Sequence, residues 1–384
     1  DAIDAARRGR EDGLSGEVAT DVVGKVAGAG VAPAAAQSVS GTRQPVVTAT
    51  YLQSNGKAQQ DPLKIVTMYQ FEPHEVSTIQ SATKAAKVEI IHCATREEFR
   101  ANLKDAEVVY GDIKSAELDL APKLKWIQTG GAGMEGVLDD GHRKSPVVMT
   151  NYARTFAHGI SETAMGLLLA LTRGLVKYYM PQFYKHTMNP VGTVKSDHHI
   201  ELAGKTMGIV GMGGIGSMIA RRAHCGFDMR VVATDAKPMP KPEYVAELHD
   251  PSWFMEMVPQ VDVLVAAAPH TKVTEGMFNE KVFRSMKKTA YFLAMSRGKL
   301  FDDMALVKAL KGGWIAGAGL DVFPQEPPPS NHPIFECQNV IMSAHTSGWS
   351  PDRQVRLIAL FADNVRRYVE GQALVNVVDK AAGY

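Results

Sequence analysis

Residues 202–216 read LAGKTMGIVGMGGIG, and they carry the most specific fold signal in the chain. Its last six residues, GMGGIG, have the spacing G-x-G-x-x-G, with an apolar run before them and a helical pattern after them. Asp235 ends the next apolar run, RVVATD, 19 residues after Gly216. A strand, a glycine turn, a helix and an acid at the end of a second strand make up a dinucleotide-binding βαβ unit. The sequence predicts such a unit here.

The residues of this loop have distinct predicted tasks. Gly211 permits a tight turn, Gly213 lets the backbone approach a pyrophosphate, and Gly216 brings the helix close to the strand. The N–H groups at the helix start favour an anion. The predicted cofactor-binding residues of the loop are Gly211, Met212, Gly213, Gly214, Ile215 and Gly216. A glycine-rich turn without a ligand is the alternative.

Asp235 predicts which dinucleotide binds. Its carboxylate would accept hydrogen bonds from the adenosine ribose, and its charge would repel the 2′-phosphate of NADP, so the pattern favours NAD. Lys237 stands two residues further on and weakens this preference.

Short apolar runs alternate with amphipathic runs on both sides of the loop, which predicts parallel sheets built from βαβ units. Before the loop, strands are expected at 63–69, 88–94, 106–111 and 125–129, with helices at 74–86, 96–104 and 117–124. From the loop onward, strands are expected at 206–210, 230–235, 261–268, 290–295, 316–321 and 340–343, with helices reaching about residue 225 and at 302–311. Two such series predict an α/β protein with two doubly wound parallel-sheet domains.

The apolar stretch 161–173, SETAMGLLLALTR, opens with Ser and Glu, which predicts a helix that starts at Ser161. This helix is expected to begin the second domain. From the sequence, it could pack against another subunit or form a core helix between the two domains.

Composition restricts the class of function. The 384 residues include 42 basic and 41 acidic side chains, a net charge of +1, which argues against a general nucleic-acid binder. The three cysteines, Cys93, Cys225 and Cys337, are too scattered for a disulfide framework or a zinc site, so no metal is expected. No run reaches the roughly 18 apolar residues of a membrane span, so no membrane partner is expected.

Residues 1–61 are rich in Ala, Gly, Ser and Gln and show no periodicity, which predicts a poorly ordered or wrapping extension. Arg7-Arg8 followed by the run 26–37 resembles a twin-arginine export signal, but charged residues interrupt its apolar core. We therefore expect a cytoplasmic protein, with export to the periplasm as the alternative.

Three polar residues follow predicted strands further along the chain. Arg297 comes after YFLAMS, Glu326 lies in DVFPQEPPP, and His345 lies in SAHTSG. Open α/β sheets bind their ligands at the carboxyl ends of the strands. The sequence therefore predicts that these residues belong to one site.

With these motifs in this order, the chain resembles the D-isomer-specific 2-hydroxyacid dehydrogenase family from about residue 63 to 378. The matching stretches are 202–216, the Arg297-Gly298 pair, 317–328 (GAGLDVFPQEPP) and His345. The resemblance implies an NAD-dependent homodimeric oxidoreductase that transfers a hydride between nicotinamide and a small 2-hydroxy or 2-oxo acid. Glyoxylate, hydroxypyruvate or another 2-ketoacid is the implied substrate.

The resemblance also implies a domain plan. A Rossmann NAD-binding domain would span 156–345. A discontinuous, flavodoxin-like substrate domain would combine 62–155 with 346–384.

Catalytic roles follow from the same resemblance. His345 would be the general acid and base, because imidazole exchanges a proton near neutral pH. Glu326 would orient its ring. Arg297 would bind the substrate carboxylate with a planar, permanently charged fork.

Further contacts are implied around this catalytic set. Gly131 and Ala132, in TGGAG, would hold the substrate carboxylate through backbone N–H groups. Asp321 would meet the nicotinamide carboxamide, and Ala268-Pro269 would pass close to its ribose.

The chain departs from the family pattern at Ala294, where Asn is usual, at Ala344, where Pro is usual, and at Gly214, where a larger residue is usual. These changes would loosen the positions of Arg297 and His345 and make the phosphate loop more pliable. A dinucleotide-sensing protein without turnover is the alternative function, although the intact acid/base set argues against it.

Overall fold

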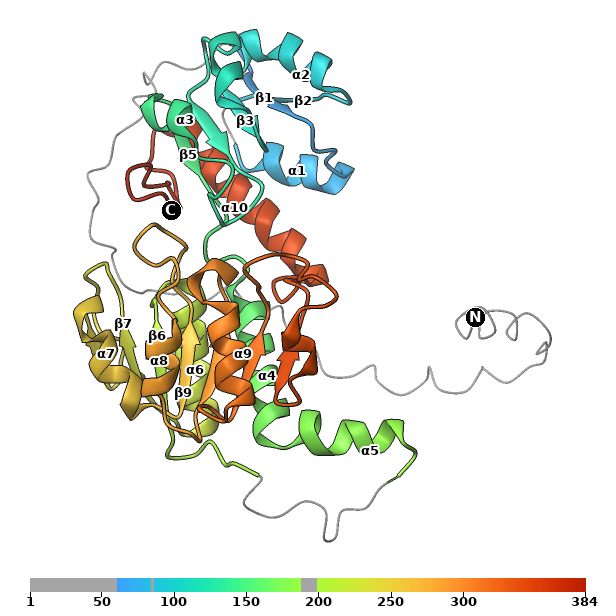
Figure 1. The fold of residues 1–384 in the computed structure, drawn as a ribbon. Helices are drawn as coiled ribbons and strands as arrows, with labels where there is room; N and C mark the ends of the chain where they lie inside the picture. Colours follow the sequence, from blue (N-terminus) through green and yellow to red (C-terminus); the bar gives the residue numbers. More distant parts are fainter. Residues whose placement is uncertain (1–60, 84–85, 188–198) are drawn as a thin grey trace, which may run out of the picture. The chain divides into compact units, whose positions relative to one another are not determined.

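Two parallel sheets organise the chain (Figure 1). The structure is a computed structural model that describes residues 61–83, 86–187 and 199–384. The expected α/β class with two doubly wound parallel-sheet domains is confirmed. The predicted extension, including Arg7-Arg8 and the run 26–37, lies outside the described residues except for Asp61.

The first sheet has five parallel strands in the order β2-β1-β3-β4-β5. This order is that of flavodoxin-like folds, as expected. Its strands are β1 (Leu63–Thr67), β2 (Val88–His92), β3 (Val108–Tyr110), β4 (Trp126–Gln128) and β5 (Val148–Thr150). The first four strands lie in predicted strand ranges, whereas the short strand β5 was not predicted.

The second sheet has seven parallel strands in the order β12-β11-β10-β9-β6-β7-β8. Its strands are β6 (Thr206–Val210), β7 (Arg230–Thr234), β8 (Glu247–His249), β9 (Val263–Ala266), β10 (Tyr291–Ala294), β11 (Gly317–Leu320) and β12 (Val340–Met342). The strand order is that of a Rossmann sheet with one added edge strand. It reverses between β6 and β9, where such sheets bind their ligands.

The helices fill the connections between the strands. Their bounds are α1 (Pro73–Ser81), α2 (Arg96–Asn102), α3 (Asp140–Lys144), α4 (Ala157–Thr172), α5 (Met180–Tyr184), α6 (Gly214–Phe227), α7 (Phe254–Met257), α8 (Glu280–Ser285), α9 (Asp303–Lys311) and α10 (Pro351–Val369). A π-helical turn, Leu175–Tyr179, precedes α5. Helix α1 ends five residues before its predicted end at 86, and the predicted helix 117–124 is a 3₁₀ helix, Ser115–Leu120.

Helix α4 begins at Ala157, four residues before the predicted start at Ser161. The Ser161 hydroxyl does not cap the helix. Instead it donates to the carbonyl of Ala157 at 2.5 Å, one turn back within the same helix. Helix α4 lies against α6 and the seven-stranded sheet, where Leu167 and Leu168 are buried, so it is a core helix of this chain.

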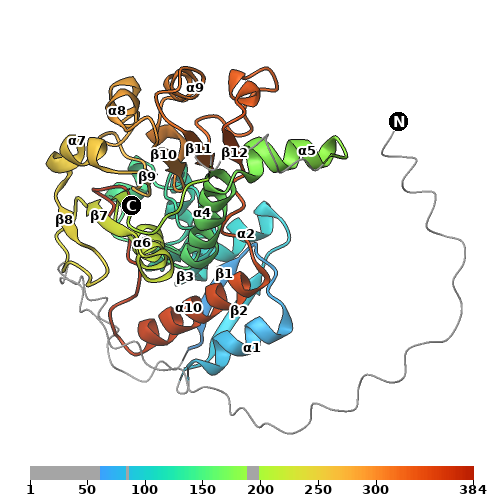
Figure 2. The ribbon, with the colours of Figure 1, turned by 90° about the horizontal axis from the view of Figure 1, so that it is seen from below.

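Helix α10 returns the chain to the five-stranded sheet, where it lies beside α1 (Figure 2). Leu357, Phe361 and Val365 are buried in one cluster with Tyr110 and Trp126 of that sheet. The C-terminal segment therefore completes the first sheet's core, as a discontinuous domain requires. The exact boundaries at 155/156 and 345/346 stay predictions.

Candidate active site

The predicted site residues of the seven-stranded sheet all follow the carboxyl ends of its strands. Gly211 follows β6, Asp235 follows β7, Ala268 follows β9, Arg297 follows β10, Asp321 follows β11 and His345 follows β12. Because the strands are parallel, these segments emerge at one edge of the sheet.

The glycine loop fits a dinucleotide. Gly211 has a φ of +96°, and a Cβ there would lie 2.6 Å from the backbone of Ala268, which follows the neighbouring strand β9. A Cβ on Gly216 would lie 1.9 Å from the carbonyl oxygen of Gly211, so only glycine lets α6 start this close to β6. Gly213 has open space above it, and no side chain caps α6 there. The start of α6 is therefore an open cradle for an anion.

The carboxylate of Asp235 holds this cradle in shape. One oxygen accepts from the backbone N–H of Met212 at 2.7 Å, and the other accepts from that of Lys237 at 2.7 Å. A carboxylate has about four acceptor positions, so Asp235 retains capacity for a ribose hydroxyl. The Lys237 ammonium lies 4.1 Å from the ring centre of Tyr384.

His345 and Glu326 form a close pair. Nδ1 of His345 lies 2.7 Å from one oxygen of Glu326, and the other oxygen accepts from the N–H of Phe323 at 2.9 Å. Their side chains are 43% and 38% exposed, so the pair is open to a ligand. The bond at Nδ1 leaves Nε2 as the ring atom that faces other groups.

Asp321 fastens the loop that carries His345. Its buried carboxylate accepts from the hydroxyls of Ser343 and Ser347 and from the N–H groups of Thr346 and Ser347. Its carbonyl accepts from the N–H of His345 at 2.8 Å. Asp321 therefore positions the histidine, and its predicted contact with a carboxamide stays a prediction.

The guanidinium of Arg297 is hydrogen-bonded to groups that follow strands of both sheets. Its Nη1 donates to the Ser296 carbonyl at 2.7 Å, and its Nε donates to Glu135, in the loop after β4, at 3.2 Å. Gly133 makes this approach possible, because a Cβ there would lie 1.8 Å from an Arg297 nitrogen. Gly298 is required for a similar reason, since a Cβ there would lie 1.9 Å from the backbone of Phe323.

Arg297, Glu326 and His345 line one cavity of about 190 Å³. The complete lining is Glu135, His270, Arg297, Gly298, Lys299, Phe323, Pro324, Glu326 and His345. Sequence reasoning missed Glu135, His270 and Lys299 as site residues. The one sequence feature that could have indicated them is that each lies a few residues after a predicted strand.

Gly131 and Ala132 lie in the same loop as Glu135, outside the residues that line the cavity. The Gly131 carbonyl accepts from the Tyr152 N–H at 2.9 Å, and the Ala132 carbonyl accepts from the Asn151 side chain at 2.9 Å. These bonds tie the loop to the segment after β5. The predicted contact of their N–H groups with a substrate carboxylate stays a prediction.

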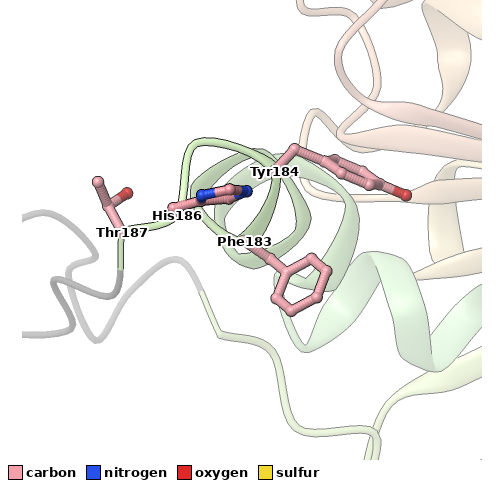
Figure 3. Close-up of a pocket in the computed structure, with 4 residues that line it drawn as sticks. All are labelled: Phe183, Tyr184, His186 and Thr187. Carbon is pink, nitrogen blue, oxygen red and sulfur yellow. The ribbon is translucent and has the colours of Figure 1, made fainter. Parts of the chain in front are cut away.

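A larger hollow, of about 390 Å³, lies on α5 and is lined by Phe183, Tyr184, His186 and Thr187. Figure 3 shows these side chains pointing in different directions from one short surface segment. The hollow contains no acid–base pair and no strand end. We therefore place the chemistry in the smaller cavity.

Residues 61–83, 86–187 and 199–384 hold no cluster of three or more His, Cys, Asp or Glu side chains suited to a metal ion. In these residues, no single helix is long and apolar enough to cross a membrane. Helix α4 and the segment Leu175–Tyr184, which are bent relative to each other, would together have the length and apolar composition of a span.

Comparison with known proteins shows what the whole chain is similar to. The model of the family described as D-isomer specific 2-hydroxyacid dehydrogenase, NAD binding domain, matches residues 165–347. The chain is 34% identical over 292 residues to a glyoxylate reductase of Thermofilum pendens, which covers 73% of this chain and 85% of that protein.

Two solved structures share the fold. A D-isomer specific 2-hydroxyacid dehydrogenase of Xanthobacter autotrophicus Py2, in complex with NADPH and MES, matches with a TM-score of 0.71 at 21% identity, over 84% of this chain and 100% of that one. The NADPH-dependent glyoxylate/hydroxypyruvate reductase of Sinorhizobium meliloti, in complex with NADP and sulfate, matches with a TM-score of 0.69 at 26% identity, over 84% and 99%.

Proposed function

Since this chain belongs to the D-isomer specific 2-hydroxyacid dehydrogenase family, we propose that it interconverts a small 2-oxo acid of the glyoxylate type and its 2-hydroxy acid, with NAD as cofactor. It is a dehydrogenase that acts on CH–OH donors with a nicotinamide cofactor. The observation that carries the proposal is the 2.7 Å contact between His345 and Glu326 in the same cavity as Arg297.

Arg297 binds the carboxylate of the substrate. Its guanidinium is a planar fork that stays charged, and it offers two parallel donors to a carboxylate. The cavity of about 190 Å³ suits an acid with a short side chain. Binding in this way brings the 2-oxo group toward His345, which lines the same cavity.

His345 carries the proton of the reaction. The nicotinamide, when bound, supplies or accepts the hydride. During reduction, Nε2 of His345 gives a proton to the carbonyl oxygen, and during oxidation it takes the proton of the hydroxyl group. Glu326 keeps the ring in the productive orientation through Nδ1, and the Phe323 N–H fixes Glu326 in turn.

Asp235 supports NAD rather than NADP in this proposal. It follows β7, with its carboxylate beside the glycine loop, where the adenosine ribose of a bound dinucleotide is expected. A 2′-phosphate there would meet a negative charge. Lys237 is the neighbouring cation that reduces this discrimination.

The first test is NADH oxidation at 340 nm with glyoxylate, pyruvate, hydroxypyruvate and phenylpyruvate, with NADPH in parallel. Replacing His345 by Ala should lower kcat by about 10²- to 10⁴-fold, the usual contribution of general acid–base catalysis. The dissociation constant of NADH should stay within about twofold, because the ring acts on the substrate. His74→Ala, an exposed histidine on α1, is the matched control.

Two results would contradict the proposal. Wild-type protein that binds NADH but turns over none of these acids would favour a dinucleotide sensor. A His345→Ala variant that keeps wild-type kcat would remove His345 from the proton transfer.

We also propose that the chain forms a homodimer. The buried face of α4 packs within its own chain, so a partner would use the apolar side chains that follow it. Leu175, Met180, Phe183 and Tyr184 are exposed on this segment, and the last two are more than 70% exposed. Contiguous exposed apolar groups of this kind mark association surfaces.

A further inference from the structure

Arg154 lies directly on Gly214 at the start of α6. A Cβ built on Gly214 would lie 2.7 Å from Cγ, 2.8 Å from Cα and 2.9 Å from Cβ of Arg154. Contacts this short with backbone atoms exclude any side chain at position 214. Gly214 therefore makes room for an arginine from the segment between β5 and α4.

The backbone of Arg154 is strained. Its φ is +72°, in the left-handed region that glycine adopts freely and that other residues rarely adopt. The Arg154 carbonyl accepts from the N–H of Ala157 at 3.1 Å, which ties the strained turn to the first residue of α4. Arginine in a position better suited to glycine costs stability, and such strain gathers at functional sites.

The glycine loop offers an anion the backbone N–H groups and the positive end of α6, but no full positive charge. GMGGIG contributes backbone N–H groups but no cationic side chain, while the pyrophosphate of a dinucleotide is doubly negative. Gly213 is open to the ligand, and Arg154 is the residue that covers the adjacent Gly214. The Arg154 side chain is exposed, and its stem already passes the loop at Cγ.

We propose that Arg154 is a cofactor-binding residue whose guanidinium binds the pyrophosphate of the nicotinamide dinucleotide. The planar fork of Arg suits two phosphate oxygens. Gly214 and Arg154 then act as a pair. The absence of a side chain at Gly214 leaves space for Arg154, whose guanidinium reaches the phosphates. The inference rests on the nicotinamide cofactor and not on the identity of the substrate.

Direct binding tests this proposal without turnover. Dissociation constants of NADH, NADPH, ADP-ribose and adenosine are measured by titration calorimetry for wild type and for Arg154→Gly, Arg154→Asn and Arg154→Lys. Gly and Asn both tolerate a left-handed φ, so these variants keep the turn while removing the charge. Arg221→Ala is the matched control, because it removes an exposed arginine from α6 away from the loop.

In Arg154→Gly and Arg154→Asn, NADH, NADPH and ADP-ribose should each bind at least 10-fold more weakly. Adenosine, which lacks phosphate, should be unaffected, and Arg154→Lys should lose less than the neutral variants. Raising the salt concentration should weaken ADP-ribose binding to wild type more than to Arg154→Gly. The melting temperature of Arg154→Gly should equal or exceed that of wild type.

Three outcomes would overturn the proposal. Unchanged affinities in both neutral variants would remove Arg154 from the site. An equal loss for adenosine would mean that the variants distort the loop. A loss confined to NADPH would assign Arg154 to the 2′-phosphate instead of the pyrophosphate. Each of these readings is independent of whether any 2-oxo acid is a substrate.

Discussion

The carboxylate of Glu135 lies 3.2 Å from Nε of Arg297, so an acid from the loop after β4 engages the guanidinium that would bind the substrate. Both residues line the same cavity. A substrate carboxylate must therefore compete with a carboxylate of the protein for one cation. Glu135 also brings a negative charge into this cavity.

Neutralising Glu135 should strengthen substrate binding. We expect Glu135→Gln to lower the KM for glyoxylate about 3- to 10-fold with a smaller change in kcat, because the pair is partly exposed and screened by solvent. Oxaloacetate, with a second carboxylate, should gain more than glyoxylate. Initial rates of NADH oxidation against both acids measure this.

Glu89→Gln is the control for that experiment, since Glu89 is an exposed acid on β2. It should leave both KM values unchanged. An unchanged KM in Glu135→Gln would mean that the ion pair does not compete with the substrate.

Asp235 should set the cofactor preference through its charge. Asp235→Asn keeps one oxygen acceptor for the Met212 or Lys237 N–H while removing the negative charge. The ratio of kcat/KM for NADPH to that for NADH should rise about 10- to 100-fold, because a 2′-phosphate would no longer meet a carboxylate. Steady-state kinetics with both cofactors measure the ratio, and a ratio that stays at the wild-type value contradicts the assignment.

Glu117 should make the stability of the five-stranded half depend on acid pH. Burial raises the pKa of this carboxyl, but hydrogen bonds from Arg96, Arg100 and the Lys114 N–H outweigh burial and hold the pKa at about 2, against an ordinary value of 4.5. A pKa that is lower in the folded state stabilises the fold fully above pH 4.5. That stabilisation is lost as the pH falls toward 2.

Glu117→Gln should lower the free energy of unfolding at pH 7 by about 3 kcal/mol. It should also flatten the dependence of stability on pH below about 4.5. Urea unfolding at pH 7 and at several pH values down to 3 measures both effects. A variant with the wild-type slope in this acid range would show that other carboxyl groups cause it.

The exposed apolar segment around α5 should determine the oligomeric state. Light scattering after gel filtration should give a dimer for wild type, and Phe183→Glu should shift it toward monomer by placing a charge in an apolar contact. Phe335→Glu changes another exposed phenylalanine and should leave the dimer intact. A wild-type monomer, or a dimer insensitive to Phe183→Glu, would exclude this surface.

Sequence reasoning located the central strands well because their signal is local. The run Thr206–Val210 matches β6 residue for residue, since buried apolar residues end abruptly at a glycine. Strand β8, Glu247–His249, has one apolar residue and gives no strand pattern, so it was missed; β5, Val148–Thr150, was missed as well. The start of α4 was misplaced because Ser161 looks like a cap in the sequence but bonds to its own helix.

The proposed catalytic residues could also be predicted from the sequence, because Arg297, Glu326 and His345 each follow a predicted strand. Glu135 and Arg154 were not readable as site residues. Glu135 meets Arg297 across 162 residues of chain, and Arg154 meets Gly214 across 60, so neither contact leaves a pattern in a short window. The unusual glycine at position 214 was the one sequence feature related to Arg154. That Arg154 excludes a side chain there became clear only from the fold.

Helix α10 has a consequence for the order in which the protein is made. Its buried face covers strands that lie more than 200 residues earlier in the chain, β1, β3 and β4. During synthesis the seven-stranded sheet is complete while this face of the earlier sheet still lacks its cover. Nascent chains released before Pro351 should therefore be cleaved by protease within residues 62–155 and spared within the Rossmann half. We therefore expect the synthesis of α10 to protect the five-stranded half against proteolysis and aggregation.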